Sequence, residues 1–164
     1  MLQHVLDAAE RSTLAPIVLV VGHEADEVLG SVRLGRAAVV RNELYATGQS
    51  SSLRAGLRAT GDVDAVVVLL GDQPRVTAAL LDALVERQRA SSAAAVVSVW
   101  KGRRTPPTLL HRDLWPALER LTGDVGAREV LAARDDVALV EVDERLGSLD
   151  DVDLPEDLAR LSAS

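Results

Sequence analysis

Hydrophobic residues along this chain fall alternately into short unbroken runs and into stretches with helical spacing. Apolar residues three or four positions apart predict helices near residues 2–9, 23–32, 51–59, 77–89, 114–121, 125–133 and 155–161. The unbroken runs predict strands at 17–21, 37–40, 65–70, 93–100, 108–111 and 137–142. Strands that alternate with helices are typical of βαβ units, which build a parallel sheet covered by helices on both faces. The sequence therefore predicts an α/β fold, layered αβα, with a mostly parallel sheet.

The composition narrows the class of protein. The 164 residues contain no repeat, low-complexity tract or linker, so we expect one compact domain spanning 1–164. Phe is absent, so the core must consist of Ala, Val and Leu. The lack of cysteine excludes disulfides and thiolate metal sites. A net charge of −7 argues against nucleic-acid binding, and without a signal peptide or membrane-length apolar run we expect a cytoplasmic protein without membrane contact.

The run 65–70 leads directly into Gly71, Asp72, Gln73 and Pro74. Ligands of open α/β sheets bind outside the carboxyl ends of the strands, which is where Asp72 is expected. A carboxylate there, with no adjacent basic residue, suits a divalent metal ion held against a phosphate. The alternative is that Asp72 only caps a turn.

Three serines, Ser50, Ser51 and Ser52, stand at the start of the predicted helix 51–59. Hydroxyls and unpaired backbone N–H groups at a helix N-terminus can bind an anion or a nucleobase, although an ordinary N-cap explains the same residues. Arg54 lies in the first helical turn, where a cation is unfavourable. A bound phosphate would account for it.

Asp124, Asp153 and the loop 101–107 each have a structural and a functional interpretation. Asp124 is a natural N-cap for the helix 125–133, and Asp153 begins a capping box with Glu156. Asp153 would supply a second metal ligand if the fold brings it near Asp72. The loop 101–107 is basic and rich in proline, which suits either an anionic substrate or a solvated surface.

Several common catalytic patterns are absent from the sequence. It contains no GxGxxG, GxxxxGK[ST] or GxSxG motif, and its histidines lack metal-ligand spacing. The chemistry that remains is metal-assisted phosphoryl or nucleotidyl transfer, in which the protein mainly orients groups and neutralises charge.

The chain resembles the MobA-like nucleotidyltransferases, and within them the molybdenum cofactor cytidylyltransferases. The similarity lies in the order and spacing of VVGHEADEV (20–28), GQSSSLRAGL (48–57), VVLLGDQPRVT (67–77), GDVGAR (123–128) and DVDLPEDL (151–158). The resemblance implies a Rossmann-like αβα sandwich. It also implies Mg²⁺- or Mn²⁺-dependent transfer of a nucleotide from an NTP, typically CTP, to the phosphate of molybdopterin, with release of pyrophosphate.

The resemblance also assigns roles to individual residues. Asp72 matches the metal-binding aspartate, and Asp153 matches a second acidic position near the metal. Gly71, directly before Asp72, is expected to take part in nucleotide binding. The loop around base and ribose corresponds to Ser50, Ser51, Ser52 and Arg54. Asp124 and Arg128 match the acceptor side, where we also place Arg104.

Two departures from the family pattern affect what we expect. The family begins with a strand and a loop of the form GGxSxRMGxxK that grips the triphosphate, and residues 1–5 match a point just after this unit. We therefore expect exposed apolar edges on the neighbours of that strand and little activity from this chain by itself. Thr105-Pro106-Pro107 stands where relatives carry Gly-His-Pro, which leaves the acceptor open.

Two other functions fit the same residues. The chain could be a catalytically weak cofactor-binding or maturation protein for a molybdoenzyme, which would then be its partner, or a sugar-nucleotide pyrophosphorylase. Each alternative is compatible with a monomer or a homodimer.

Overall fold

The computed structural model describes residues 1–149. Its helices are α1 (Leu2–Arg11), α2 (Ala25–Gly30), α3 (Gln49–Ala59), α4 (Ala78–Ser91), α5 (Trp115–Leu118) and α6 (Ala127–Leu131), with short 3₁₀ turns at Tyr45–Thr47 and Arg112–Leu114. Its strands are β1 (Val18–Val21), β2 (Ala38–Arg41), β3 (Ala65–Val68), β4 (Ala95–Trp100), β5 (Arg103–His111) and β6 (Val137–Glu141). The predicted helix 155–161 lies outside the described residues. No helix within 1–149 has the length and apolar character needed to cross a bilayer.

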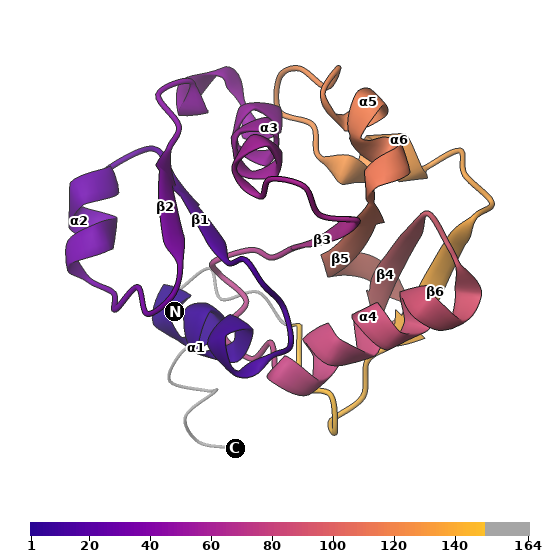
Figure 1. The fold of residues 1–164 in the computed structure, drawn as a ribbon. Helices are drawn as coiled ribbons and strands as arrows, with labels where there is room; N and C mark the ends of the chain where they lie inside the picture. The colour runs from indigo at the N-terminus through magenta and orange to yellow at the C-terminus, as the bar shows by residue number, and fades with distance from the viewer. Residues whose placement is uncertain (150–164) are drawn as a thin grey trace.

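The strands form two sheets (Figure 1). One contains β1 and β2 in parallel, and the other has the order β3-β5-β4-β6. The predicted α/β class is confirmed, but the second sheet is mixed because β5 runs antiparallel to both β3 and β4. The physical reason is a tight turn after β4, where Lys101 and Gly102 both have positive φ and send the chain straight back.

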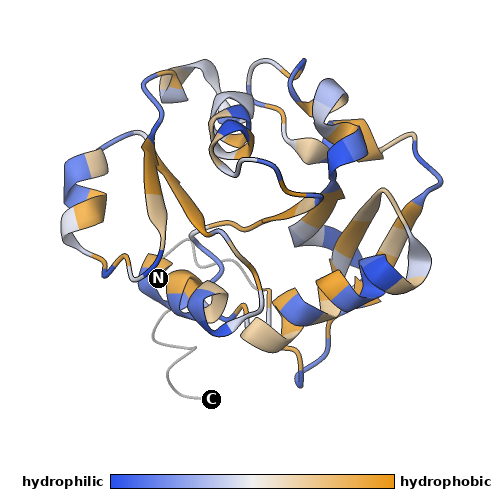
Figure 2. Ribbon diagram, in the orientation of Figure 1, coloured by the Kyte–Doolittle hydropathy of each residue, from blue (hydrophilic) through white to orange (hydrophobic). Residues whose placement is uncertain are grey.

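Helices cover both faces of the larger sheet with two separate groups of buried side chains. Leu80, Leu81 and Leu84 of α4 pack with Ala8 and Ala9 of α1 on one face. On the other face, α3, α5 and α6 contribute Leu57, Leu118 and Leu131. Consecutive residues of β4 point to opposite faces, so Val96 joins the first group while Ala95 and Val97 join the second. Figure 2 shows hydrophobic colouring along the strands and on the helix surfaces that face them. The core of Ala, Val and Leu expected from the composition is confirmed.

In Figure 1, β1 of the smaller sheet lies beside β3 of the larger sheet. Residues of both strands line one groove. Its volume is about 1560 Å³. Both strands line this groove, together with apolar side chains of α1 and α3. All residues of β3 and three of the four residues of β1 are half-buried. Within residues 1–149, β1 pairs with β2 and β3 pairs with β5, each along one side.

Candidate functional site

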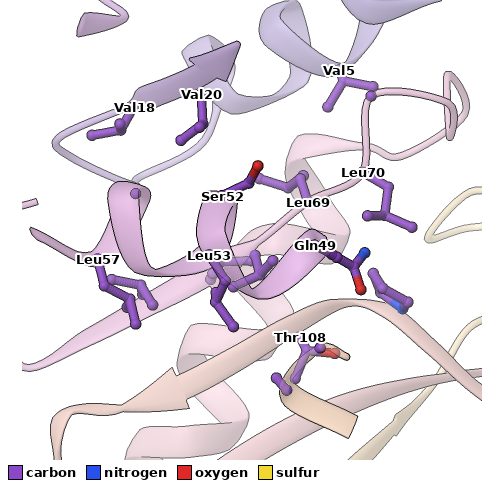
Figure 3. Close-up of a pocket in the computed structure, with 18 of the residues that line it drawn as sticks. Val5, Val18, Val20, Gln49, Ser52, Leu53, Leu57, Leu69, Leu70 and Thr108 are labelled. Atoms are coloured by element: carbon purple, nitrogen blue, oxygen red, sulfur yellow. The ribbon is translucent and has the colours of Figure 1, made fainter. Parts of the chain in front are cut away.

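The groove becomes polar at the end where α3 begins. Gln49 and Ser52 of α3 line it there, as do Asp124 and Arg128 (Figure 3 shows Gln49 and Ser52). Gly71, which follows β3 after Leu69 and Leu70, and Arg104 of β5 also line the groove. The structure therefore brings together four segments that are distant in sequence along this groove. We take this polar end as the candidate site.

The start of α3 is fixed by contact with residues 123–124. The Gln49 amide N–H donates to the Asp124 carboxylate over 3.4 Å, although the two residues are 75 positions apart. Ser50 donates from its hydroxyl to the Gly123 carbonyl over 2.8 Å and from its backbone N–H to the same oxygen over 3.3 Å. Gly48 has φ of 110°, and a Cβ on it would overlap the Gly123 carbonyl group and lie 2.6 Å from the Asp124 amide nitrogen. Only glycine permits this approach of the two segments.

The three serines have different surroundings. Ser50 and Ser51 are almost fully buried, with 1% and 4% of their surface exposed. The Ser51 hydroxyl lies 2.8 Å from the Gly48 carbonyl oxygen and accepts a hydrogen bond of 2.8 Å from the Asn42 amide. The same amide group donates to the Ser52 hydroxyl over 3.0 Å, and Ser52 lines the groove. The geometry therefore favours Ser52 for contact with a ligand, whereas the inward-facing Ser50 and Ser51 shape the loop. Binding by all three serines stays a prediction.

Internal partners account for two features that had suggested a phosphate. Arg54 donates from Nη1 to the Leu121 carbonyl over 2.7 Å, so this cation has an acceptor within the protein. The first amides of α3 bond to Asp124 and Gly123, as described above. These contacts connect α3 to the segment that precedes α6. A ligand role for Arg54 stays a prediction.

Asp124 does not cap the helix for which it was predicted, α6. The cap residue of α6 is Gly126, and no side chain there accepts a hydrogen bond. Asp124 lies two residues earlier and bonds the first amide of α3 instead. Local sequence could not show this, because the helix that Asp124 caps comes from a different part of the chain. Asp124 and Arg128 are both exposed and both line the groove.

Asp72 follows the carboxyl end of β3, as predicted. It is exposed and takes part in no ion pair among residues 1–149. Its neighbour Gln73 is fully buried and donates to the Thr105 hydroxyl over 3.2 Å, which ties this turn to β5. Asp153 lies outside the described residues.

A magnesium ion in such enzymes can be bound through one or two carboxylates and the phosphates of the substrate. Within residues 1–149 no three His, Asp or Glu side chains cluster as a complete metal cage. Asp72 is an exposed carboxylate beside a groove-lining residue, and it fits an ion held partly by substrate phosphates. It does not fit a closed structural metal centre.

Sequence reasoning missed three residues of this site. Gln49 lines the groove, Asn42 holds two of the serine hydroxyls, and Gly48 permits the contact with Gly123. Gln49 and Gly48 belong to the segment GQSSSLRAGL, so their neighbourhood was recognised. No sequence pattern pointed to Asn42, because its amide reaches Ser51 and Ser52 only once residues 42–52 have folded into a loop.

Residues 1–137 match the MobA-like NTP transferase domain. The chain belongs to the MobA-like NTP transferase family. It is therefore a member of a family of nucleotidyltransferase enzymes. Residues from four of the five segments on which the resemblance was based line the groove of this MobA-like chain, and the fifth segment lies beyond residue 149.

Curated relatives of this MobA-like chain include proteins from Bacillus subtilis and Lactococcus lactis. The purine catabolism protein PucB of Bacillus subtilis is 36% identical over 114 residues, which cover 67% of this chain and 54% of PucB. The bifunctional protein GlmU of Lactococcus lactis is 36% identical over 97 residues, 59% of this chain and 21% of GlmU. The chain thus spans about half of one relative and a fifth of the other.

A solved structure of similar fold is Rv0371c of Mycobacterium tuberculosis in complex with manganese. It is 27% identical, with a TM-score of 0.80, and the alignment covers 99% of this MobA-like chain and 86% of Rv0371c. A relative of the same fold therefore binds a divalent metal.

Proposed function

We propose that this chain carries out or supports transfer of CMP from CTP to the phosphate of molybdopterin or a related phosphate-bearing acceptor. An acceptor phosphate oxygen would attack the α-phosphorus of the nucleotide. The bond from that phosphorus to its bridging oxygen would break, and pyrophosphate would leave. The observation that carries the proposal is the polar end of the groove, where the start of α3 meets residues 123–128 and the carboxyl end of β3.

The residues at this end suit three separate tasks. Ser52 and Gln49 offer a hydroxyl and an amide toward the groove, which suits the hydrogen-bonding groups of a nucleoside. Arg104 and Arg128 are exposed cations along the groove and suit the anionic phosphates of nucleotide and acceptor. Asp72, together with Asp153, would hold Mg²⁺ or Mn²⁺, which neutralises phosphate charge when bound.

The relatives support the general reaction more strongly than the substrate. The family is that of NTP transferases, and Rv0371c has been solved with manganese. PucB is described as a purine catabolism protein, and this description names neither a nucleotide nor an acceptor. Preference for CTP and for a molybdopterin acceptor is our proposal.

Nucleotide binding can be tested independently of turnover. We expect CTP with Mg²⁺ to raise the melting temperature more than GTP or UTP, because ligands that bind the native state stabilise it. Ser52→Ala should reduce this shift, whereas Ser31→Ala, whose hydroxyl bonds only to the Val28 carbonyl among the described residues, should leave it unchanged. Pyrophosphate release with a molybdopterin acceptor then tests the transfer reaction. If no nucleotide raises the melting temperature and no pyrophosphate appears, the proposal is wrong.

Metal binding has its own matched pair of variants. Mn²⁺ broadens NMR signals close to it, so we expect broadening at residues 71–73 in the presence of CTP. Asp72→Asn should abolish that effect. Asp26→Asn, which removes an exposed carboxylate bonded to Arg41, should preserve it. Broadening that is unchanged by Asp72→Asn would exclude Asp72 as a ligand.

A further inference from the structure

The turn that follows β3 has Asp72 at its surface and Gln73 in its interior. Asp72 is exposed, whereas the side chain of Gln73 is fully buried. The Gln73 amide donates to the Thr105 hydroxyl of β5 over 3.2 Å. An apolar residue would fill a buried position without needing a polar partner, and a buried amide is costly unless it is hydrogen-bonded. The amide therefore serves the contact with Thr105 rather than the packing.

Sheet pairing does not connect this turn to the part of β5 that contains Thr105. The last pair between β3 and β5 joins Val68 to Thr108. Beyond it, two prolines at 106–107 accompany a register shift between β4 and β5, because proline has no N–H to donate to the ladder. The hydrogen bond from Gln73 to Thr105 therefore crosses a region that the β3–β5 ladder does not span.

The far end of the same turn is held by backbone contacts. Gly147 has φ of 114°, and a Cβ on it would lie 2.5 Å from the Arg75 carbonyl oxygen. Gly147 forms a β-bridge with Val76, and the Ser148 N–H donates to the Arg75 carbonyl over 3.5 Å. The turn is thus fixed by β3 before it and by residues 147–148 after it. The buried side chain of Gln73 fixes its middle.

The bond between Gln73 and Thr105 closes a short path between two oppositely charged groups. Asp72 directly precedes Gln73, and Arg104, which lines the groove, directly precedes Thr105. A magnesium ion on one carboxylate takes other ligands from substrate phosphates, at about 2.0–2.1 Å and in nearly octahedral geometry. The separation of Asp72 and Arg104 therefore decides whether one phosphate group can contact both the metal and the guanidinium.

We propose that Gln73 is a positioning residue that acts through Thr105. It holds the Asp72 carboxylate and the Arg104 guanidinium at the separation that a metal-bound nucleotide requires. This inference rests on the proposed function, because it takes Asp72 as the metal ligand. Without the Thr105 hydroxyl, the buried amide loses this acceptor and the turn shifts. Binding of the metal–nucleotide complex then weakens, whereas binding of the nucleotide without metal does not.

The test compares CTP binding with and without metal by isothermal titration calorimetry. We define the metal enhancement as the CTP affinity in Mn²⁺ divided by the CTP affinity in EDTA. Thr105→Val keeps the shape of the side chain but removes the hydroxyl. We expect it to lower the metal enhancement about tenfold, because groups that orient a metal ligand typically contribute about 10–100-fold to metal affinity. The affinity in EDTA should not change, and Thr105→Ser, which keeps the hydroxyl, should retain the enhancement.

Ser98→Ala is the matched control. The Ser98 hydroxyl is fully buried and donates to the Pro107 carbonyl over 2.7 Å, and Ser98 pairs with Thr105 on the neighbouring strand. Its loss should lower the melting temperature, as the loss of a buried hydrogen bond does, without changing the metal enhancement. If the contact between Gln73 and Thr105 were only structural, Thr105→Val and Ser98→Ala would behave alike.

Asp72→Asn separates this inference from the proposed function. If Asp72→Asn abolishes the metal enhancement and Thr105→Val leaves it intact, the inference is wrong while the proposed metal ligand stands. The inference is also wrong if Thr105→Val lowers the CTP affinity equally in Mn²⁺ and in EDTA, or if Ser98→Ala lowers the enhancement as much. A parent protein without metal enhancement, or an Asp72→Asn variant that retains it, overturns the proposed metal ligand and this inference together.

Discussion

Replacing Gly48 by alanine should destabilise the protein by separating the start of α3 from residues 123–124. Gly48 has φ of 110° and ψ of 169°, a region that is essentially restricted to glycine. Placing a side chain in that conformation costs about 1–3 kcal/mol. The added methyl group would also overlap the Gly123 carbonyl, which is backbone and cannot rotate away.

Strain and overlap together predict a loss of about 3 kcal/mol, since overpacking alone typically costs about 1–3 kcal/mol. With a urea m-value of about 2 kcal/mol/M, the unfolding midpoint would fall by about 1.5 M. Circular dichroism at increasing urea concentration measures this shift. The variant should remain folded in water if the parent has the usual stability of about 5–15 kcal/mol.

Two other glycine variants separate the destabilisation caused by backbone strain from that caused by steric overlap. Gly61 also has positive φ, of 72°, but no atom lies within 4 Å of its would-be Cβ, so Gly61→Ala should show backbone strain only, of about 1 kcal/mol. Gly30 has neither feature, and Gly30→Ala should be neutral or slightly stabilising. If Gly48→Ala and Gly61→Ala differ by less than about 0.5 kcal/mol, the close contact with Gly123 does not constrain α3 and our account of the site is wrong.

Three further changes test other contacts. Asn42→Ala should cost about 1–3 kcal/mol in urea unfolding, because the buried amide holds two serine hydroxyls and removal leaves them without that donor; a loss below 0.5 kcal/mol would contradict this. Arg54→Met should cost about 1 kcal/mol through the lost bond to the Leu121 carbonyl, and an unchanged midpoint would show that this bond contributes nothing. The Arg134 guanidinium, by hydrogen bonding, lowers the pKa of Asp136. The small stabilisation from this pair is therefore present above the ordinary carboxyl pKa and is lost as the pH falls through the lowered value. Arg134→Gln should return the pKa of Asp136, measured by NMR titration, to its ordinary range, and an unmoved pKa would refute the assignment.

Strands and helices with strong patterns were predictable, and the hairpin was not. The apolar runs at 65–70 and 137–142 became β3 and β6, and Thr77 caps α4 with its hydroxyl. β5 begins five residues before the run at 108–111, because polar and proline residues at 103–107 hid a strand whose pairing comes from β4. Tertiary pairing decided its extent and direction.

The candidate site likewise has features that local sequence predicts and features that depend on tertiary contacts. The position of Asp72 after β3 and the start of a helix at the serines followed from local pattern, because nearby residues determine where strands end and helices begin. The inward direction of Ser50 and Ser51 and the cap that Asp124 gives to α3 depend on contacts between distant segments. Those contacts have no local signature.

The near absence of aromatic residues gives the fold a pair of built-in optical probes. Trp100 packs against the side-chain group under α1 and α4, whereas Trp115 packs against the group under α3, α5 and α6. They are the only two tryptophans in the chain, so replacing either by phenylalanine leaves a single indole whose fluorescence reports on one layer. Unfolding curves from the two single-tryptophan proteins would therefore reveal whether the layers melt together or one before the other.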